Sequence, residues 1–140
     1  MSDSLDAVLA HLDATHDAQL ERLFDLLRIP SVSTDSAHDG DVRRAAEFCS
    51  DLLTASGFNS SVRDTTGHPM VVGHVDGPAD APHVLYYGHY DVQPAAPLNE
   101  WNSGPFEPEI RKTERHPDGA IFARGATDDK GQMFIHVKAV

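Results

Sequence analysis

An apolar run that stops in front of a histidine and an aspartate is the feature of this sequence that most constrains its fold. The run covers residues 84–87, and Gly88 closes it. Four apolar residues that end at a glycine are typical of a short buried strand. His89 and Asp91 follow, and residues two positions apart point to the same side of an extended chain. The pattern therefore predicts a strand end where His89 and Asp91 face one cleft, with Tyr90 turned away.

The chemistry of this His-x-Asp pair allows two interpretations. A neutral imidazole nitrogen is a good zinc ligand, and a metal-bound histidine usually donates its other N–H to a carboxylate. His89 and Asp91 supply both groups. Taken alone, however, the pattern more often marks a surface histidine beside an aspartate.

A second motif has the same position relative to an apolar run. RGATDDKG, residues 124–131, follows the apolar run 120–123 and places Asp128 and Asp129 just beyond a predicted strand. In α/β sheets, ligands gather beyond the carboxyl ends of the strands. The two motifs together therefore indicate one site built from segments about forty residues apart in the sequence.

GHYDVQP (88–94) and RGATDDKG (124–131), taken together, resemble motifs of metallopeptidase family M20. The intervening W-x-x-x-PF-x-P of residues 101–108 is similar to the carnosinase-like, cytosolic dipeptidase branch of that family. The resemblance runs from the first helix to Val140 and implies the N-terminal part of the catalytic domain for residues 1–140. It also implies that the lid or dimerisation domain and the C-terminal half of that domain are absent from these residues.

The resemblance also implies roles for individual residues. His89 would bind one metal, Asp91 would act as the catalytic aspartate that holds this histidine from behind, and Asp128 would bridge two Zn²⁺ ions, with Mn²⁺ or Co²⁺ as alternatives. Asp129 is interpreted as serving the turn, and the Asp128–Asp129 peptide bond would be cis. The family's adjacent glutamates, one of them the general base, and its remaining ligands have no counterpart in the 140 residues.

The activity implied for the parent protein is zinc-dependent hydrolysis of dipeptides or short peptides, by an enzyme that the resemblance makes a homodimer. The ligand count leads us to expect that the 140-residue chain alone is inactive. Two alternatives stay open. One is an N-acyl amino acid amidohydrolase, a deacylase of the same family, and the other is a non-catalytic α/β binding module without a metal.

Composition limits the possible binding partners of the protein and its cellular compartment. The net charge of −11 argues against nucleic acid and anionic membranes as partners. Cys49 is the single cysteine, so no internal disulfide can form, and a reducing compartment is favoured. The N-terminus lacks the basic and apolar regions of a signal peptide, and no apolar run is long enough to span a membrane. We therefore expect a cytoplasmic protein.

Hydrophobic periodicity predicts an α/β fold in which helices flank a mixed sheet. The predicted elements are helices over 5–27, 42–53 and from 130 onward, and strands over 59–64, 70–75, 84–87 and 120–124. The first helical stripe is thinnest at His16, so it fits either one long helix or a bent pair. Residues 93–119 carry five prolines and are predicted to be irregular. The last helical stripe reaches Val140 without a stop signal, so we expect the chain to end within a helix, with Phe134 and Val137 poorly covered.

Overall fold

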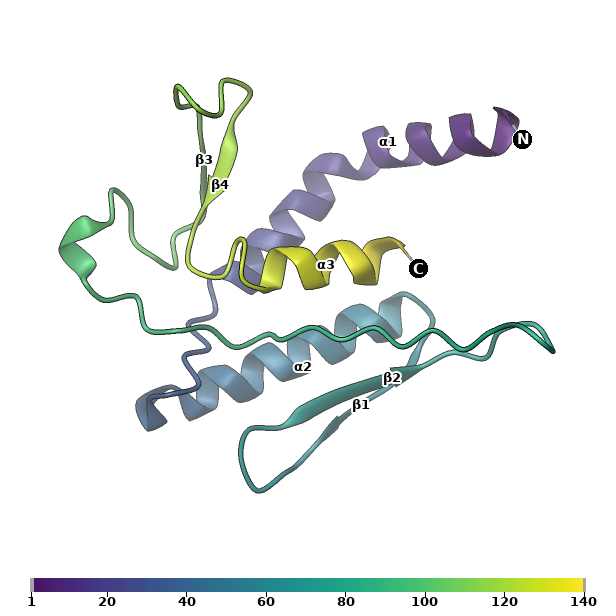
Figure 1. Ribbon diagram of the computed structural model, residues 1–140, viewed down its shortest axis with the longest axis horizontal. Helices are drawn as coiled ribbons and strands as arrows, with labels where there is room; N and C mark the ends of the chain where they lie inside the picture. The colour runs from purple at the N-terminus through teal and green to yellow at the C-terminus, as the bar shows by residue number, and fades with distance from the viewer. Residues whose placement is uncertain (1, 140) are drawn as a thin grey trace.

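The computed structural model describes residues 2–139 and the side-chain environments from residue 4 onward. Val140, which the sequence assigns to the last helix, lies outside the described residues. Within residues 2–139, three α-helices, two short 3₁₀ helices and two β-hairpins follow one another (Figure 1). Their order is α1 (Ser2–Leu27), η1 (Ser36–His38), α2 (Asp39–Ala55), β1 (Asn59–Arg63), β2 (Met70–His74), η2 (Leu98–Glu100), β3 (Glu109–Arg111), β4 (Ala120–Phe122) and α3 (Lys130–Ala139).

The two N-terminal helices form where the periodicity predicts them. Helix α1 is a single continuous helix that ends before Pro30, as expected because a residue preceding proline avoids the helical region. Helix α2 ends in a Schellman motif, in which Gly57 has φ +90° and donates to the Thr54 carbonyl. The N–H of Phe58 donates to the Leu53 carbonyl and completes the motif.

The strands form two separate antiparallel hairpins. In the first, Asn59 pairs with His74 and Arg63 with Met70, and this hairpin packs on α2. The second joins β3 to β4 and includes a strand, β3, inside the segment predicted to be irregular. The α/β class is confirmed, but the strands form two small sheets instead of one mixed sheet.

The strand predicted over residues 84–87 is wrong for this structure. Residues 81–91 run as an extended segment outside any helix or strand, and Leu85 is 93% exposed. The only ladder contact that the described residues show near this segment is an isolated parallel bridge between Val32 and Val92. An apolar run becomes a buried strand only where neighbouring strands satisfy its backbone and cover its side chains.

The core lies where the C-terminal half of α1, helix α2 and helix α3 meet. Leu26, Ile29, Ala45 and Cys49 form its central cluster. Phe134 of α3 is only 5% exposed, so the expectation that it would be poorly covered is wrong. Val137 is partly buried. Helix α3 packs against α1 (Figure 1).

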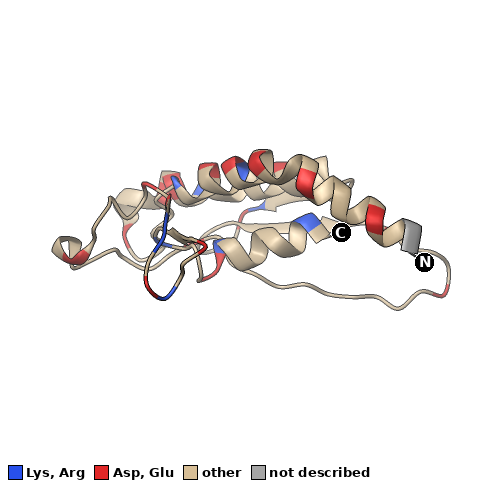
Figure 2. Ribbon diagram, turned by 90° about the horizontal axis from the view of Figure 1, so that it is seen from above, with Lys and Arg blue, Asp and Glu red and all other residues tan. Residues whose placement is uncertain are grey.

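Helix α1 carries both acidic and exposed apolar side chains. Acidic residues follow one another along α1, the helix that leads to the N-terminus in Figure 2. The N-terminal half of the same helix exposes four aliphatic side chains, those of Leu5, Val8, Leu9 and Leu12. No helix within residues 2–139 has the length and apolarity needed to cross a membrane.

Candidate metal centre

The loop that follows α1 holds the His-x-Asp segment in place. The Val92 N–H donates to the Ser31 carbonyl at 2.9 Å, and the Ser31 hydroxyl donates to the Tyr90 carbonyl at 2.7 Å. The Tyr90 side chain packs against the core cluster, and its hydroxyl donates to the Pro69 carbonyl. Tyr90 therefore points away from its two neighbours, as the alternation of an extended chain predicts.

The imidazole of His89 is oriented by Asp91. Its Nδ1 lies 3.1 Å from the Asp91 carbonyl oxygen and 3.1 Å from Asp91 Oδ1. Both oxygens are acceptors, so Nδ1 carries a proton and donates it. The other carboxylate oxygen of Asp91 accepts the Ser33 hydroxyl at 2.5 Å. Asp91 is thus fixed by two groups, and it sets the direction in which Nε2 of His89 points.

Asp128 meets the free side of the same ring. Nε2 of His89 lies 3.0 Å from Asp128 Oδ1, although the two residues are 39 positions apart. The Asp128 side chain is 83% exposed, whereas those of His89 and Asp91 are each 36% exposed. The structure thus brings together the three residues that the two motifs singled out.

The three carboxylates around His89 favour its protonated form. Partial burial of the ring lowers the pKa of His89, but the hydrogen bonds to Asp91 and Asp128 and the charges of Asp91 and Asp129 outweigh this effect. The net pKa lies above the ordinary histidine value. When His89 is protonated, Nε2 donates to Asp128, and a divalent cation would compete with that proton for the same two atoms.

A tight turn presents Asp128 to the histidine. Gly125 has φ +85°, in the left-handed region that favours glycine. A Cβ on Gly131 would lie 2.1 Å from the Ala126 carbonyl oxygen, so only glycine fits there. The Asp128–Asp129 peptide bond is cis, which confirms the prediction drawn from the resemblance.

Lys130 connects this turn to the first helix. Its side chain is fully buried, and Nζ donates to the Leu26 carbonyl at 3.0 Å and to the Ile29 carbonyl at 2.7 Å. These carbonyls lie at the C-terminal end of α1, where a cation is favoured by the helix dipole. Burial lowers the pKa of Lys130 to about 8. The lysine fixes the start of α3 and therefore the residues immediately before it.

The donor set suits a divalent metal but is small. One imidazole nitrogen and one carboxylate oxygen are the ligand types that zinc prefers, and the hydrogen bond from Nδ1 to Asp91 is the usual support for a zinc-bound histidine. Across residues 2–139, no group of three or more His, Cys, Asp or Glu side chains is arranged to hold a metal ion. His89 and Asp128 thus fit part of a metal site.

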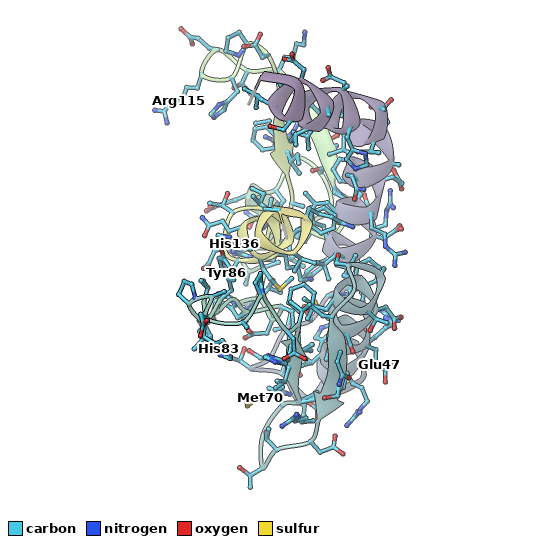
Figure 3. All side chains as sticks on the ribbon, turned by 90° about the vertical axis from the view of Figure 1, so that its right-hand side faces the viewer. Glu47, Met70, His83, Tyr86, Arg115 and His136 are labelled. Atoms are coloured by element: carbon cyan, nitrogen blue, oxygen red, sulfur yellow. The ribbon has the colours of Figure 1, made fainter. Side chains whose placement is uncertain are left out.

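A cavity of about 570 Å³ adjoins the site. It lies among the extended segment, α2, β2 and α3, and its lining includes His89 and Asp91 but not Asp128. Tyr86 and His136 come together at its edge, with ring centroids 5.3 Å apart (Figure 3). Most of the remaining lining is apolar, so this cavity does not by itself define a site for a cation.

Comparison with known proteins shows which proteins the chain resembles. Residues 85–140, which carry both motifs, match the sequence profile of peptidase family M20/M25/M40. Proteins similar to the chain over nearly its whole length are metallodipeptidases of this family. The chain is therefore similar to metallodipeptidases of the M20 family, in agreement with the resemblance of the two motifs.

Three particular proteins illustrate the similarity. The chain is 32% identical over 150 residues to the Cys-Gly metallodipeptidase dug1 of Schizosaccharomyces pombe, covering all of this chain and 30% of that protein. The solved structure of the dipeptidase Dug1p of Saccharomyces cerevisiae superposes with a TM-score of 0.81 at 30% identity, over 98% of this chain and 30% of that one. Human carnosine dipeptidase 1 shares the fold, with a TM-score of 0.82 at 23% identity over 96% and 30% of the two chains. The chain thus spans about 30% of the length of these relatives.

Several residues that build the site did not stand out in the sequence. Ser33 and Lys130 each have a partner far away in the sequence, Asp91 and the end of α1 respectively. A short polar loop after the first helix was the only local signal for Ser33. Nothing local indicates which carbonyls a buried lysine will reach, because that depends on how the helices pack.

Proposed function

We propose that this chain contributes His89 and Asp128 as ligands to the divalent metal centre of a dipeptidase, with Asp91 as the aspartate that orients His89. The observation that carries the proposal is the convergence of Nε2 and Asp128 Oδ1 at 3.0 Å while Asp91 accepts the opposite ring N–H. The proposed reaction is zinc-dependent hydrolysis of dipeptides, and the names of the relatives favour substrates of the Cys-Gly class. Mn²⁺ and Co²⁺ are alternative metals.

Each residue has a distinct task in this proposal. Asp91 holds the proton on Nδ1, which leaves the lone pair of Nε2 for the metal. Ser33 holds Asp91, and the exposed carboxylate of Asp128 offers oxygens on the same side as Nε2. A divalent metal bound there would polarise a peptide carbonyl and lower the pKa of a bound water.

The wider properties of the parent protein are part of the proposal. We infer a complete active site with two metal ions, a homodimeric parent enzyme and a cytoplasmic location, which is supported by the single, buried Cys49. Residues 1–140 would form the N-terminal part of the catalytic domain. The dipeptidase is favoured over the deacylase because the named relatives are dipeptidases, and over a binding module because the two motifs meet in space.

Zinc titration tests the ligand assignment. We expect Zn²⁺ to bind the untagged chain, and His89→Ala to weaken that binding by about tenfold or more, because a direct ligand is lost. Isothermal titration calorimetry gives the affinity, and the visible absorption spectrum of bound Co²⁺ reports the ligand set.

The matched control is His74→Ala. His74 belongs to the same His-x-Asp pattern and lies 3.0 Å from Asp76 Oδ1, but both side chains are exposed. We expect its removal to leave zinc affinity unchanged. Equal losses in the two variants, or no loss in His89→Ala, would show that His89 is not a ligand.

A further inference from the structure

The second aspartate of the DD pair makes a contact that the sequence does not indicate. Oδ2 of Asp129 accepts the backbone N–H of His89 at a distance of 3.0 Å. His89 is therefore held at two points by adjacent residues of one turn, since Asp128 contacts its ring and Asp129 contacts its main chain.

The position of Asp129 at the start of α3 makes this contact unusual. Its carbonyl accepts the Met133 N–H at 2.8 Å, so Asp129 is the N-cap residue of the helix. The side chain of an N-cap aspartate commonly accepts an amide from the first turn of its own helix. Here a carboxylate oxygen of Asp129 accepts the N–H of His89, forty positions earlier, and this bond connects the start of α3 to the extended segment 81–91.

Gly88 lets the two segments approach closely enough for this bond. A Cβ at position 88 would lie 3.1 Å from Asp129 Oδ2 and 3.1 Å from Met133 Cβ. Both neighbours are restrained, Met133 by the helix and Asp129 by its bond to His89. The glycine that ends the apolar run thus provides the space in which Asp129 reaches the backbone.

We propose that Asp129 is a positioning residue that fixes the main chain of His89, and that it is not a metal ligand. This inference rests on the proposed function, because the site that Asp129 positions is the proposed metal centre. Asp128 and Asp129 would then divide two tasks. Asp128 binds the cation, and Asp129 aligns the histidine that binds the cation with it.

The role requires a hydrogen-bond acceptor and does not require a negative charge, which gives a sharp test. Asp129→Asn keeps a carbonyl oxygen that can accept the His89 N–H, whereas Asp129→Ala removes the acceptor. Asp128→Asn changes the neighbouring carboxylate and is the matched control. Each variant is made in the full 140-residue chain, and circular dichroism and thermal melting compare their folding.

Two measurements report separately on the backbone N–H of His89 and on metal binding by its ring. Amide hydrogen exchange detected by NMR reports the His89 N–H, and calorimetry with Zn²⁺ reports the metal site. In Asp129→Ala we expect faster exchange of the His89 amide and about 10–100-fold weaker zinc binding, the usual effect of losing a group that supports a ligand. Asp129→Asn should keep the protected amide and bind zinc within about fivefold of wild type, because a neutral acceptor forms a weaker bond than a charged one. Asp128→Asn should lose zinc binding and leave the His89 amide protected.

Specific results would overturn the proposal. An unchanged His89 amide in Asp129→Ala would show that the contact does not hold the backbone. Zinc binding lost as completely in Asp129→Asn as in Asp128→Asn would make Asp129 a ligand. If Asp129→Ala does not fold, Asp129→Asn decides the question through the same two measurements. If the wild-type chain binds no zinc, the proposed function fails. The exchange rates of the His89 amide still show whether Asp129 holds the main chain of His89.

Discussion

Cys49 shows how burial alone determines the chemistry of a residue. The thiol is 4% exposed on the apolar face of α2, and its sulfur lies 4.0 Å from the sulfur of Met133. Burial raises the pKa of Cys49 from 9.0 to about 12. A thiol that stays protonated is a poor nucleophile, so Cys49 acts in this fold as a small core side chain.

The raised pKa predicts how stability depends on pH. Between pH 9 and pH 12 the unfolded state loses the thiol proton and the folded state keeps it. The stabilisation that comes from the protonated thiol is therefore complete below pH 9 and is lost as pH rises through this window. In this window the contribution of Cys49 should fall by about 1.4 kcal/mol per pH unit. Urea unfolding from pH 8 to pH 10.5 measures the effect. Cys49→Ala should be less stable at pH 8 because of the cavity, but it should lack this slope. Parallel curves for the two proteins would contradict the prediction.

At the scale of elements, the 125–131 turn depends on glycines that allow close backbone approach. The Gly131 position leaves no room for a Cβ, because the Ala126 carbonyl oxygen would lie 2.1 Å away. Gly131→Ala should therefore displace the turn from the start of α3 and lower the free energy of unfolding by about 1–3 kcal/mol or more.

Gly40 provides the matched control for that substitution. It lies in the first turn of α2, and a Cβ there would meet nothing within 4 Å. Gly40→Ala should raise stability by about 0.5–1 kcal/mol, because alanine loses less backbone entropy in a helix. Urea unfolding measures the free energy of unfolding of both variants. Similar changes in Gly131→Ala and Gly40→Ala would show that the close contact between position 131 and the Ala126 carbonyl does not control stability.

At the scale of the whole molecule, the number of ligands limits what these residues can do. A catalytic zinc ion normally has three protein ligands, and the residues proposed here supply His89 and Asp128 to be divided between two ions. The hydrogen-bond and ion-pair partners of His89 and Asp128 within the described residues include no glutamate that could act as a general base, a group worth about 10²–10⁴ in rate. We therefore expect the 140-residue chain to bind zinc without hydrolysing dipeptides.

Release of free amino acids from Cys-Gly and related dipeptides, with Zn²⁺ or Mn²⁺ added, measures this prediction. The positive control is a full-length Cys-Gly metallodipeptidase such as dug1, to which the chain is similar. Metal-dependent turnover that disappears in Asp128→Ala would contradict the expectation and would require ligands that the structure does not bring to the site.

Features that depend on neighbours along the chain could be predicted from the amino-acid sequence. Helical periodicity located α1, α2 and the start of α3, and Gly57 marked the end of α2. The two motifs singled out His89, Asp91 and Asp128, and the family resemblance anticipated the cis bond that follows Asp128. These features depend on side-chain spacing and on motif identity, both of which can be read along the chain.

Features that depend on a partner far away in the sequence became visible only in the folded chain. Residues 84–87 have the composition of a buried strand but remain exposed, because a strand needs neighbours for its backbone and its faces. Phe134 is buried on α3, which packs against α1, and Lys130 donates to a carbonyl near the end of α1. Asp129 contacts the His89 backbone only because the fold brings two segments forty residues apart together. Local pattern therefore identified the candidate ligands, and long-range packing determined how they are held.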